Sequence, residues 1–195
     1  MTRTSSSLLM VALLCAGVVQ AAPITYTAAL SGDAENPPNA STGTGFTTVI
    51  YDPDLHTLQV TATFSDLVSP STAAHIHCCV AAPGIAAPAT PVPSFTDFPE
   101  GVTAGSYDRL FDLTFASSFN PEFVALNGGG TAAGAEAALA AGLAARQAYL
   151  NIHSVQFPAG EIRGFLNAVP EPATLALLSI GLLGLGLNRT RRAPA

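Results

Sequence analysis

Three of the four histidines have the residue type and spacing needed to bind a metal ion. His75 and His77 are two residues apart within a short predicted strand, 73–77. Alternate residues of a strand project from the same face, so the two imidazoles can reach one ion. His153 ends a second predicted strand, 148–153. If one sheet brings these strands together, the three imidazoles form a ligand set suited to copper or zinc.

Glu161 is the expected partner of His153. If residues 154–160 form the loop of a hairpin, the residues that face each other across its two strands can be worked out. Ile152 is then opposite Ile162, His153 opposite Glu161, and Asn151 opposite Arg163. A slip of one residue would place an isoleucine opposite a charge, so the pattern supports this register. Glu161 could then accept a hydrogen bond from His153 and orient that ring for a metal, or it could pair with Arg163.

A structural role for the same histidines is the alternative. A single His-x-His pair is a weak motif, and the three rings could simply organise the sheet by hydrogen bonding. His56 lies in a predicted turn and is expected to be exposed to solvent. Asp52 and Asp54 flank a proline and are read as turn formers, and no Gly-x-Ser-x-Gly elbow is present. We therefore assign no catalytic residue.

The cysteines cannot form a disulfide scaffold. Cys15 lies in the predicted signal peptide, and Cys78 and Cys79 are adjacent. Neighbouring cysteines can close a small disulfide ring, bind a metal or remain reduced. Of these, we expect no bridge.

The elements that must position these residues are mainly strands. Period-two alternation and turn residues predict strands over 24–30, 45–51, 58–64, 73–77, 110–115, 148–153 and 161–166. The alanine-rich segment 132–147 predicts one short helix, and the proline-rich segment 83–105 predicts a long loop or lid. The expected fold is a mainly β, antiparallel β-sandwich, immunoglobulin-like or superoxide-dismutase-like, flanked by an N-terminal signal helix and a C-terminal hydrophobic helix.

The first 21 residues have the pattern of a signal peptide. Arg3 is followed by the apolar run 8–19, and Val19-Gln20-Ala21 places small residues at the cleavage position. The run is much shorter than the roughly 20 residues that a membrane-spanning helix needs. We expect residues 1–21 to be removed and residues 22–168 to form the folded domain.

The C-terminal segment 169–195 has a second export-related pattern. Pro170-Glu171-Pro172 is followed by a short apolar stretch, 173–187, predicted as a transmembrane helix, and then by Arg189, Arg191 and Arg192. These residues resemble the PEP-CTERM sorting tail of Gram-negative bacteria. The resemblance implies an inner-membrane intermediate, cleavage by an exosortase near the Pro-Glu-Pro motif, and transfer to the cell surface or to an exopolysaccharide matrix. An uncleaved anchor is the alternative.

The charge of the central domain argues against nucleic acid as a partner. The chain has no lysine, only Glu171 of its 13 acidic residues lies in the tail, and Arg109, Arg146 and Arg163 are the only cations between the two ends. The domain therefore carries a net charge of about −9, which repels phosphate backbones and anionic membrane surfaces.

Two sequence motifs resemble the CHRD domain, first described in chordin. The first is Ala74-His75-Ile76-His77, and the second combines Tyr149-Leu150-Asn151-Ile152-His153 with Gly160-Glu161-Ile162-Arg163-Gly164. The resemblance covers residues 24–168 and implies an extracellular β-sandwich more than an activity. The family usually has glycine after His-Ile-His, where this chain has Cys78. A fainter similarity to copper-zinc superoxide dismutases is limited to the His-x-His strand, and those enzymes need more histidines.

The sequence thus predicts an exported, surface-sorted CHRD-domain protein that acts as a non-enzymatic extracellular matrix or binding module. The alternative is a copper- or zinc-binding β-sandwich protein, or a metalloenzyme, that uses the histidine cluster. The predicted partners are an exosortase and, at the surface, an exopolysaccharide or another surface protein, with the membrane contacted transiently by the C-terminal helix.

Overall fold

A computed structural model describes residues 21–170 and residue 181. The domain is a curled antiparallel sheet whose strands follow the order β4-β6-β7-β1-β2-β3-β5, with β8 paired to β1. The strands are β1 (Ile24–Ser31), β2 (Thr44–Asp52), β3 (Thr57–Ser65), β4 (Ser71–Cys78), β5 (Gly105–Asp112), β6 (Ala148–Ser154), β7 (Ile162–Phe165) and β8 (Asn167–Ala168). The helices are η1 (Gly32–Ala34), η2 (Ala116–Ser118), α1 (Pro121–Leu126) and α2 (Ala132–Ala144).

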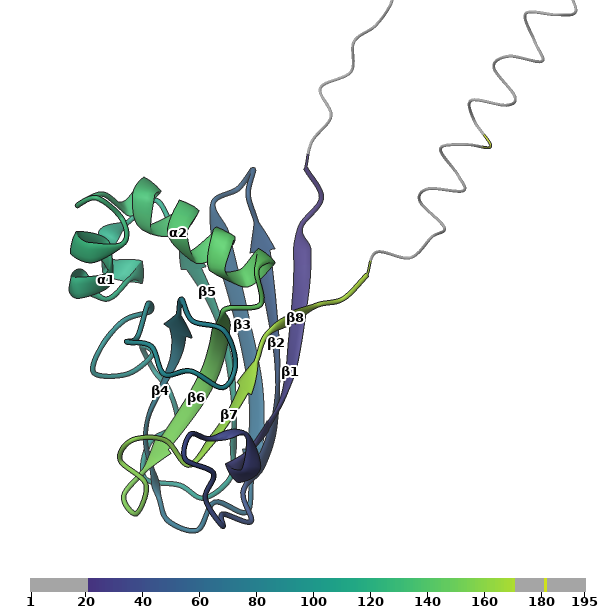
Figure 1. The fold of residues 1–195 in the computed structure, drawn as a ribbon, viewed down its shortest axis with the longest axis vertical. Coiled ribbons are helices and arrows are strands. Elements are labelled where there is room, and N and C mark those ends of the chain that lie inside the picture. Colours follow the sequence, from purple (N-terminus) through teal and green to yellow (C-terminus); the bar gives the residue numbers. More distant parts are fainter. Residues whose placement is uncertain (1–20, 171–180, 182–195) are drawn as a thin grey trace, which may run out of the picture.

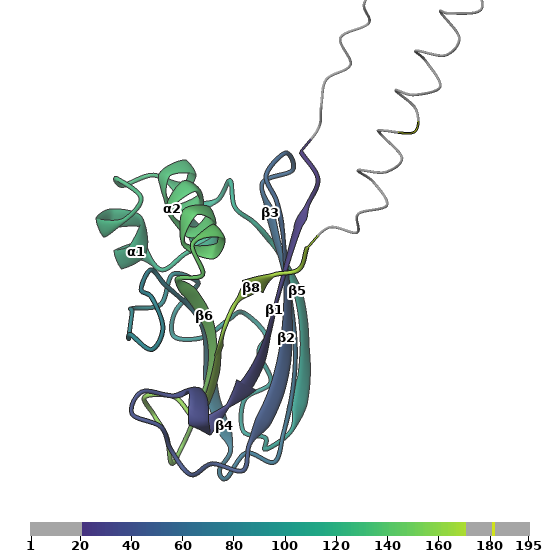
Figure 2. The ribbon, with the colours of Figure 1, turned by 45° about the vertical axis from the view of Figure 1, so that its right-hand side comes forward.

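The sheet folds over on itself to form two layers. Figure 2 shows β1, β2, β3 and β5 in one layer and β4 and β6 in the other, with α2 above them. Apolar side chains from both layers fill the space between, including Val49 and Val60 on one side and Ile76, Leu150 and Ile152 on the other, all fully buried. The predicted mainly β, sandwich-like fold is therefore confirmed.

The hairpin of β2 and β3 is built as its sequence predicts. The Asp52 side chain accepts hydrogen bonds from the backbone N–H groups of Asp54 and Leu55, which closes the turn. His56 follows in that turn with a φ of 53°. Its side chain is 53% exposed but is not free, because Nδ1 donates to the buried carboxylate of Glu136 on α2. The turn is thereby tied to the helix.

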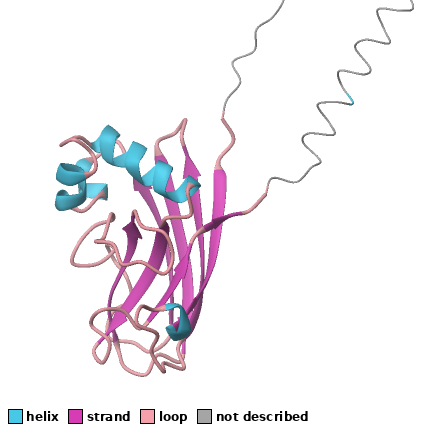
Figure 3. Cartoon of the chain, in the orientation of Figure 1, coloured by secondary structure: helices cyan, strands magenta, loops and turns pink. Residues whose placement is uncertain are grey.

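Two expectations about the remaining elements need correction. The strand expected over 110–115 is β5, which begins and ends earlier, at Gly105 and Asp112. A second α-helix, α1, was not anticipated. It begins with Asn120, whose side chain accepts from the Glu122 N–H, and with a proline in the first turn. Figure 3 shows α1 and α2 together at one end of the strands.

Cys78 and Cys79 form a disulfide, so the prediction of no bridge was wrong. Within a strand, the side chains of neighbouring residues point to opposite faces of the sheet, which would keep two adjacent thiols apart. β4 ends at Cys78, so Cys79 lies outside the strand and is not bound by this alternation. Both sulfur atoms lie against Gly142 of α2, where an added Cβ would be 2.2 Å from Cys78 Sγ and 2.7 Å from Cys79 Sγ. The helix approaches the disulfide closely because residue 142 has no side chain.

The proline-rich segment after β4 covers the edge of that strand. Ala89 N donates to Ile76 O, Phe95 N donates to Ala74 O, and Cys78 N donates to Ala87 O. Two hydroxyls complete the edge, since Thr90 Oγ1 accepts from Ile76 N and Ser94 Oγ from Ala74 N. The segment predicted as a long loop or lid is therefore an irregular strip that protects an open sheet edge.

The two ends of the domain lie side by side. Tyr26 and Thr27 of β1 pair with Ala168 and Asn167 of β8, and Val169 N donates to Thr25 O. Both chain ends leave from the same end of the domain, while η1, drawn in purple, lies at the opposite end (Figure 1). The predicted signal helix lies outside the described residues, and so does the span 173–187 apart from residue 181. Within residues 21–170, no helix is long and apolar enough to cross a membrane.

Candidate metal centre

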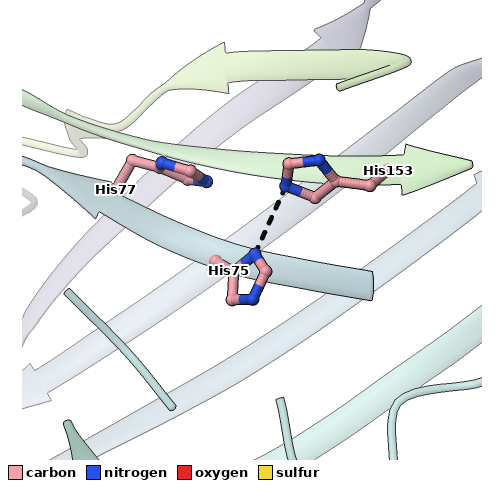
Figure 4. Close-up of side chains that lie close together, drawn as sticks. All are labelled: His75, His77 and His153. Atoms are coloured by element: carbon pink, nitrogen blue, oxygen red, sulfur yellow. Dashed lines mark hydrogen bonds between the residues drawn. The ribbon is translucent and has the colours of Figure 1, made fainter. Parts of the chain in front are cut away.

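The structure brings His75, His77 and His153 together on the face of the sheet turned away from the core. Their strands pair antiparallel, with Ala73 opposite His153, His75 opposite Asn151 and His77 opposite Tyr149. His153 consequently lies diagonally across from His75, and all three rings are on one side of β4 and β6 (Figure 4). One ring nitrogen from each histidine lies within 4.8 Å of the other two.

Backbone carbonyls hold the outward-facing nitrogen of each ring. Nε2 of His75 is 2.7 Å from Pro93 O, Nδ1 of His77 is 2.8 Å from Ala86 O, and Nδ1 of His153 is 3.0 Å from Pro158 O. A carbonyl only accepts, so in each neutral ring the proton sits on the nitrogen that faces the carbonyl. The other nitrogen then carries a lone pair: Nδ1 in His75 and Nε2 in His77 and His153.

The three lone pairs converge without a hydrogen-bond donor between them. His75 Nδ1 is 3.3 Å from His153 Nε2, a separation suited to a hydrogen bond, but both atoms are acceptors in these tautomers. His77 Nε2 is buried and has no hydrogen-bond partner among the described residues. The site therefore offers three nitrogen acceptors to a cation.

Burial keeps the rings neutral. Desolvation, helped by the neighbouring His153, lowers the pKa of His75 to about 4. Desolvation also lowers the pKa of His77 to about 4, against the hydrogen bond to Ala86 O, which raises it. The pKa of His153 is lowered by desolvation as well. Neutral imidazole is the form that binds metals, so the rings are in the binding form at neutral pH.

The site opens to solvent through His153. His75 and His77 are each 6% exposed, whereas His153 is half-buried at the open end of β6. Tyr149 closes the other side, because its ring stacks on His77 with centroids 4.9 Å apart. The Arg163 guanidinium lies 4.9 Å from the centroid of the Tyr149 ring, outside the histidine cluster. His153 is therefore the most exposed of the three rings.

Glu161 does not take part in this site, and the prediction that it orients His153 was wrong. The predicted register holds for Ile152 with Ile162 and for Asn151 with Arg163, but β7 begins at Ile162, one residue after Glu161. The carboxylate of Glu161 turns to the other side, where Oε1 accepts from Ser41 Oγ and from Val68 N, both at 2.6 Å. Its role with His153 is taken by the carbonyl of Pro158.

Arg163 pairs with the loops rather than with Glu161. Its guanidinium, 1% exposed, donates to Ala34 O from Nε, to Gly84 O from Nη1 and to Pro83 O from Nη2. The side chain fastens the segment after β1 and the segment after β4 over the sheet face that bears the histidines. Its burial could not be read from the hairpin register alone.

Comparison with known proteins agrees with this architecture. The family model for the CHRD domain matches residues 26–166, and the model for the PEP-CTERM protein-sorting motif matches residues 168–192. No match was found among the curated proteins or among the solved structures. The PEP-CTERM motif is recognised by an exosortase and implies export and sorting to the cell surface in Gram-negative bacteria. The chain therefore belongs to the CHRD-domain family and carries a PEP-CTERM sorting motif directly behind that domain.

Proposed function

We propose that this chain is a surface-sorted, non-enzymatic binding module whose CHRD domain holds one copper or zinc ion through His75, His77 and His153. The observation that carries the proposal is the convergence of three imidazole lone pairs whose opposite nitrogens are all occupied by backbone carbonyls. Metal-binding histidines are commonly oriented in this way, through a hydrogen bond from the ring nitrogen that does not bind the ion.

The spacing of the nitrogens suits a small first-row ion. Two nitrogens bound about 2.05 Å from a tetrahedral ion lie roughly 3.3 Å apart. The separation of His75 Nδ1 and His153 Nε2 is 3.3 Å. The widest separation in the set is at most 4.8 Å, so binding of one ion would draw the ring nitrogens closer together by up to about 1.5 Å.

The donor set also limits the choice of metal. Three neutral imidazoles without a carboxylate or a thiolate suit copper or zinc and are a poor match for calcium or magnesium, which prefer oxygen ligands. At a site of this kind copper(II) binds more tightly than zinc, following the usual order of divalent affinities. The purely structural alternative, a histidine cluster held by hydrogen bonds, would show no such preference.

Calorimetric titration of the purified exported protein, stripped of metal by a chelator, tests the proposal. We expect one equivalent of Cu²⁺ or Zn²⁺ to bind, with the copper complex the tighter of the two. His153→Ala and His75→Ala should each weaken binding by about 100-fold or more, because each removes one of three ligands. His56→Ala is the matched control: it deletes the fourth histidine and should leave the affinity unchanged.

The electron paramagnetic resonance spectrum of the copper(II) form provides a second measurement. It should show coupling to three imidazole nitrogens in the wild type and to two in His153→Ala. Sub-stoichiometric binding, or equal losses in His153→Ala and His56→Ala, would refute the site and leave the histidines a structural cluster.

A further inference from the structure

One end of the domain lies next to the point where the sorting tail leaves. The start of β1, the end of β2, the start of β3 and the end of β5 lie together there, because their terminal residues are paired. Val169, at the start of the tail, donates its N–H to the carbonyl of Thr25, the second residue of β1. The two α-helices lie at this end of the strands too (Figure 3). We call it the tail-side end.

Three of the most exposed large apolar residues of the described chain belong to the tail-side end. Leu55, 65% exposed, lies in the turn between β2 and β3; Phe115, 60% exposed, follows β5 by three residues; and Leu126, 75% exposed, is the last residue of α1. Single exposed apolar residues are common on protein surfaces. Three of them, from three separate segments at one end, indicate a surface that contacts an apolar partner.

The helices at the tail-side end add apolar surface and almost no charge. A hollow of about 440 Å³ between η2, α1 and Val92 has apolar walls that include Phe119 and Val124. The exposed residues within α2 are all alanines, at positions 133, 137, 141 and 144. Glu136, the one charged residue of that helix, is buried and hydrogen-bonded to side chains of β2 and the following turn. A helix without charged residues on its exposed face is typical of a face that is covered.

The sorting tail determines what this end meets. The apolar stretch 173–187 begins four residues after Val169, and four residues of extended chain span at most about 14 Å. The PEP-CTERM motif implies membrane-associated sorting. With the apolar stretch in the bilayer during that step, the lipid surface cannot be farther than this distance from Val169. The chain itself therefore brings an apolar partner within reach of the tail-side end.

The charges at the tail-side end select the kind of lipid. Asp54 and Asp112 are exposed, one residue from Leu55 and three residues from Phe115, respectively, and Arg146 is exposed just after α2. Carboxylates repel anionic headgroups, and one arginine does not offset them. A zwitterionic headgroup carries no net charge, so apolar contact with such a lipid is not opposed.

We propose that the tail-side end docks on a zwitterionic lipid surface while the sorting tail is in the membrane, with Leu55, Phe115 and Leu126 inserted among the headgroups. Three side chains without a basic face attach a protein weakly, and the tail strengthens this contact by keeping the domain at a high local concentration. Cleavage of the tail removes that advantage, so the domain leaves the membrane after sorting. The docking does not involve the three histidines.

Paramagnetic relaxation in lipid nanodiscs tests the proposal on the full chain without its signal peptide. The tail is inserted in phosphatidylcholine discs, and amide NMR signals are compared between discs with and without a gadolinium-chelating headgroup. The amides of Leu55, Phe115 and Leu126 should be broadened. The triple variant Leu55→Ser, Phe115→Ser, Leu126→Ser should lower the docked population about tenfold or more, because less apolar surface is withdrawn from water.

Val155→Ser is the matched control. Val155 is 66% exposed and follows β6 at the other end of the sheet, beyond the level at which Asn151, Arg163 and Ser31 are paired. Its own amide should not be broadened, and the variant should dock as the wild type does. If the triple variant keeps the broadening of the wild type, the tail alone brings the domain near the bilayer and the proposal is overturned. Broadening that increases when phosphatidylglycerol replaces phosphatidylcholine would also overturn it, since the contact would then be electrostatic.

Discussion

At the scale of single residues, the chemistry of the domain depends on which atoms are left without partners. The three histidines each have one nitrogen held by a loop carbonyl and one nitrogen free. Glu35 has one oxygen near the Arg163 side chain and one buried oxygen without a hydrogen-bond partner among the described residues. For the histidines, the backbone therefore fixes one nitrogen of each ring, and the other nitrogens lie close together.

Glu35 should make the stability of the domain depend on pH. Burial raises the pKa of its carboxyl to about 7, even though the nearby Arg163 lowers it, whereas the ordinary value is 4.5. Between these two values the folded protein keeps a proton that the unfolded chain releases. The stabilising contribution of the protonated Glu35 to the folded state is therefore fully present below pH 4.5 and is lost as the pH rises through about 7.

Glu35→Gln isolates this effect, because glutamine stays neutral and every histidine is unchanged. We expect the free energy of unfolding of the wild type, relative to Glu35→Gln, to fall by roughly 1–3 kcal/mol between pH 4.5 and pH 8. Urea unfolding at several pH values measures it. If the difference in unfolding free energy stays constant with pH, or grows in favour of the wild type at high pH, the pKa of Glu35 is not raised in the folded protein.

At the scale of elements, the packing of α2 against the disulfide at the end of β4 explains one residue of the helix, Gly142. Gly142 of the helix faces the sulfur atoms of Cys78 and Cys79, with no room for a Cβ. A glycine inside a helix is normally unfavourable by about 1 kcal/mol relative to alanine. Its presence here is explained by the close approach of the helix to the disulfide.

Gly142→Ala should accordingly destabilise the domain by about 1–3 kcal/mol, because overpacking outweighs the gain in helix propensity. The same substitution in a Cys78→Ala, Cys79→Ala background should be neutral or stabilising, since the clashing sulfurs are gone. Thermal unfolding of the four proteins completes a double-mutant cycle. Additive effects across the cycle would mean that residue 142 and the disulfide do not interact.

The strands were largely predictable from the sequence, but the loops that complete the site were not. Alternation places His75 and His77 on one face, and the match of Ile152 with Ile162 fixes the hairpin register. The atoms that orient the rings are carbonyls of Ala86, Pro93 and Pro158. A carbonyl is present at every residue, so no residue type marks it. Only the path of the loop decides which carbonyl faces a ring.

Glu161 shows where the pattern stopped being informative. The register pointed to His153 as its partner, but the regular ladder ends one residue earlier. Beyond the last paired residue, the direction of a side chain follows the nearest donors, which here are Ser41 and Val68. The burial of Arg163 by two distant loops could not be predicted from the strand pattern either. Contacts across more than 70 residues of chain leave no local signal.

At the scale of the whole molecule, the sorting tail determines where the domain works. The tail, 169–195, begins directly after β8, and its described residues are Val169, Pro170 and Gly181. Residues 21 and 170 both lie at one end of the domain, so the end that bears η1 is the one farthest from the tail (Figure 1).

We expect the mature chain to end near Pro170-Glu171-Pro172. The apolar stretch 173–187 is short for a permanent span and contains three glycines, which suits handover to a protease better than lasting anchorage. The intact mass of protein released from the cell surface measures the end point. Replacing the three motif residues by alanine should leave the chain in the membrane fraction. Surface-released chains that still contain Arg189–Arg192 as the main form would contradict the prediction.

The strand order also determines when the sheet can be completed. β1 is the first strand of the domain in the sequence, but its two edges pair with β2 on one side and with β7 and β8 on the other. Two of its three partner strands are therefore the last strands of the domain in the sequence. The sheet therefore cannot close around β1 until β7 and β8 are available to pair with it. Pairing between strands so far apart in the sequence is slow, so the topology imposes a delay between the appearance of β1 and the completion of the sheet.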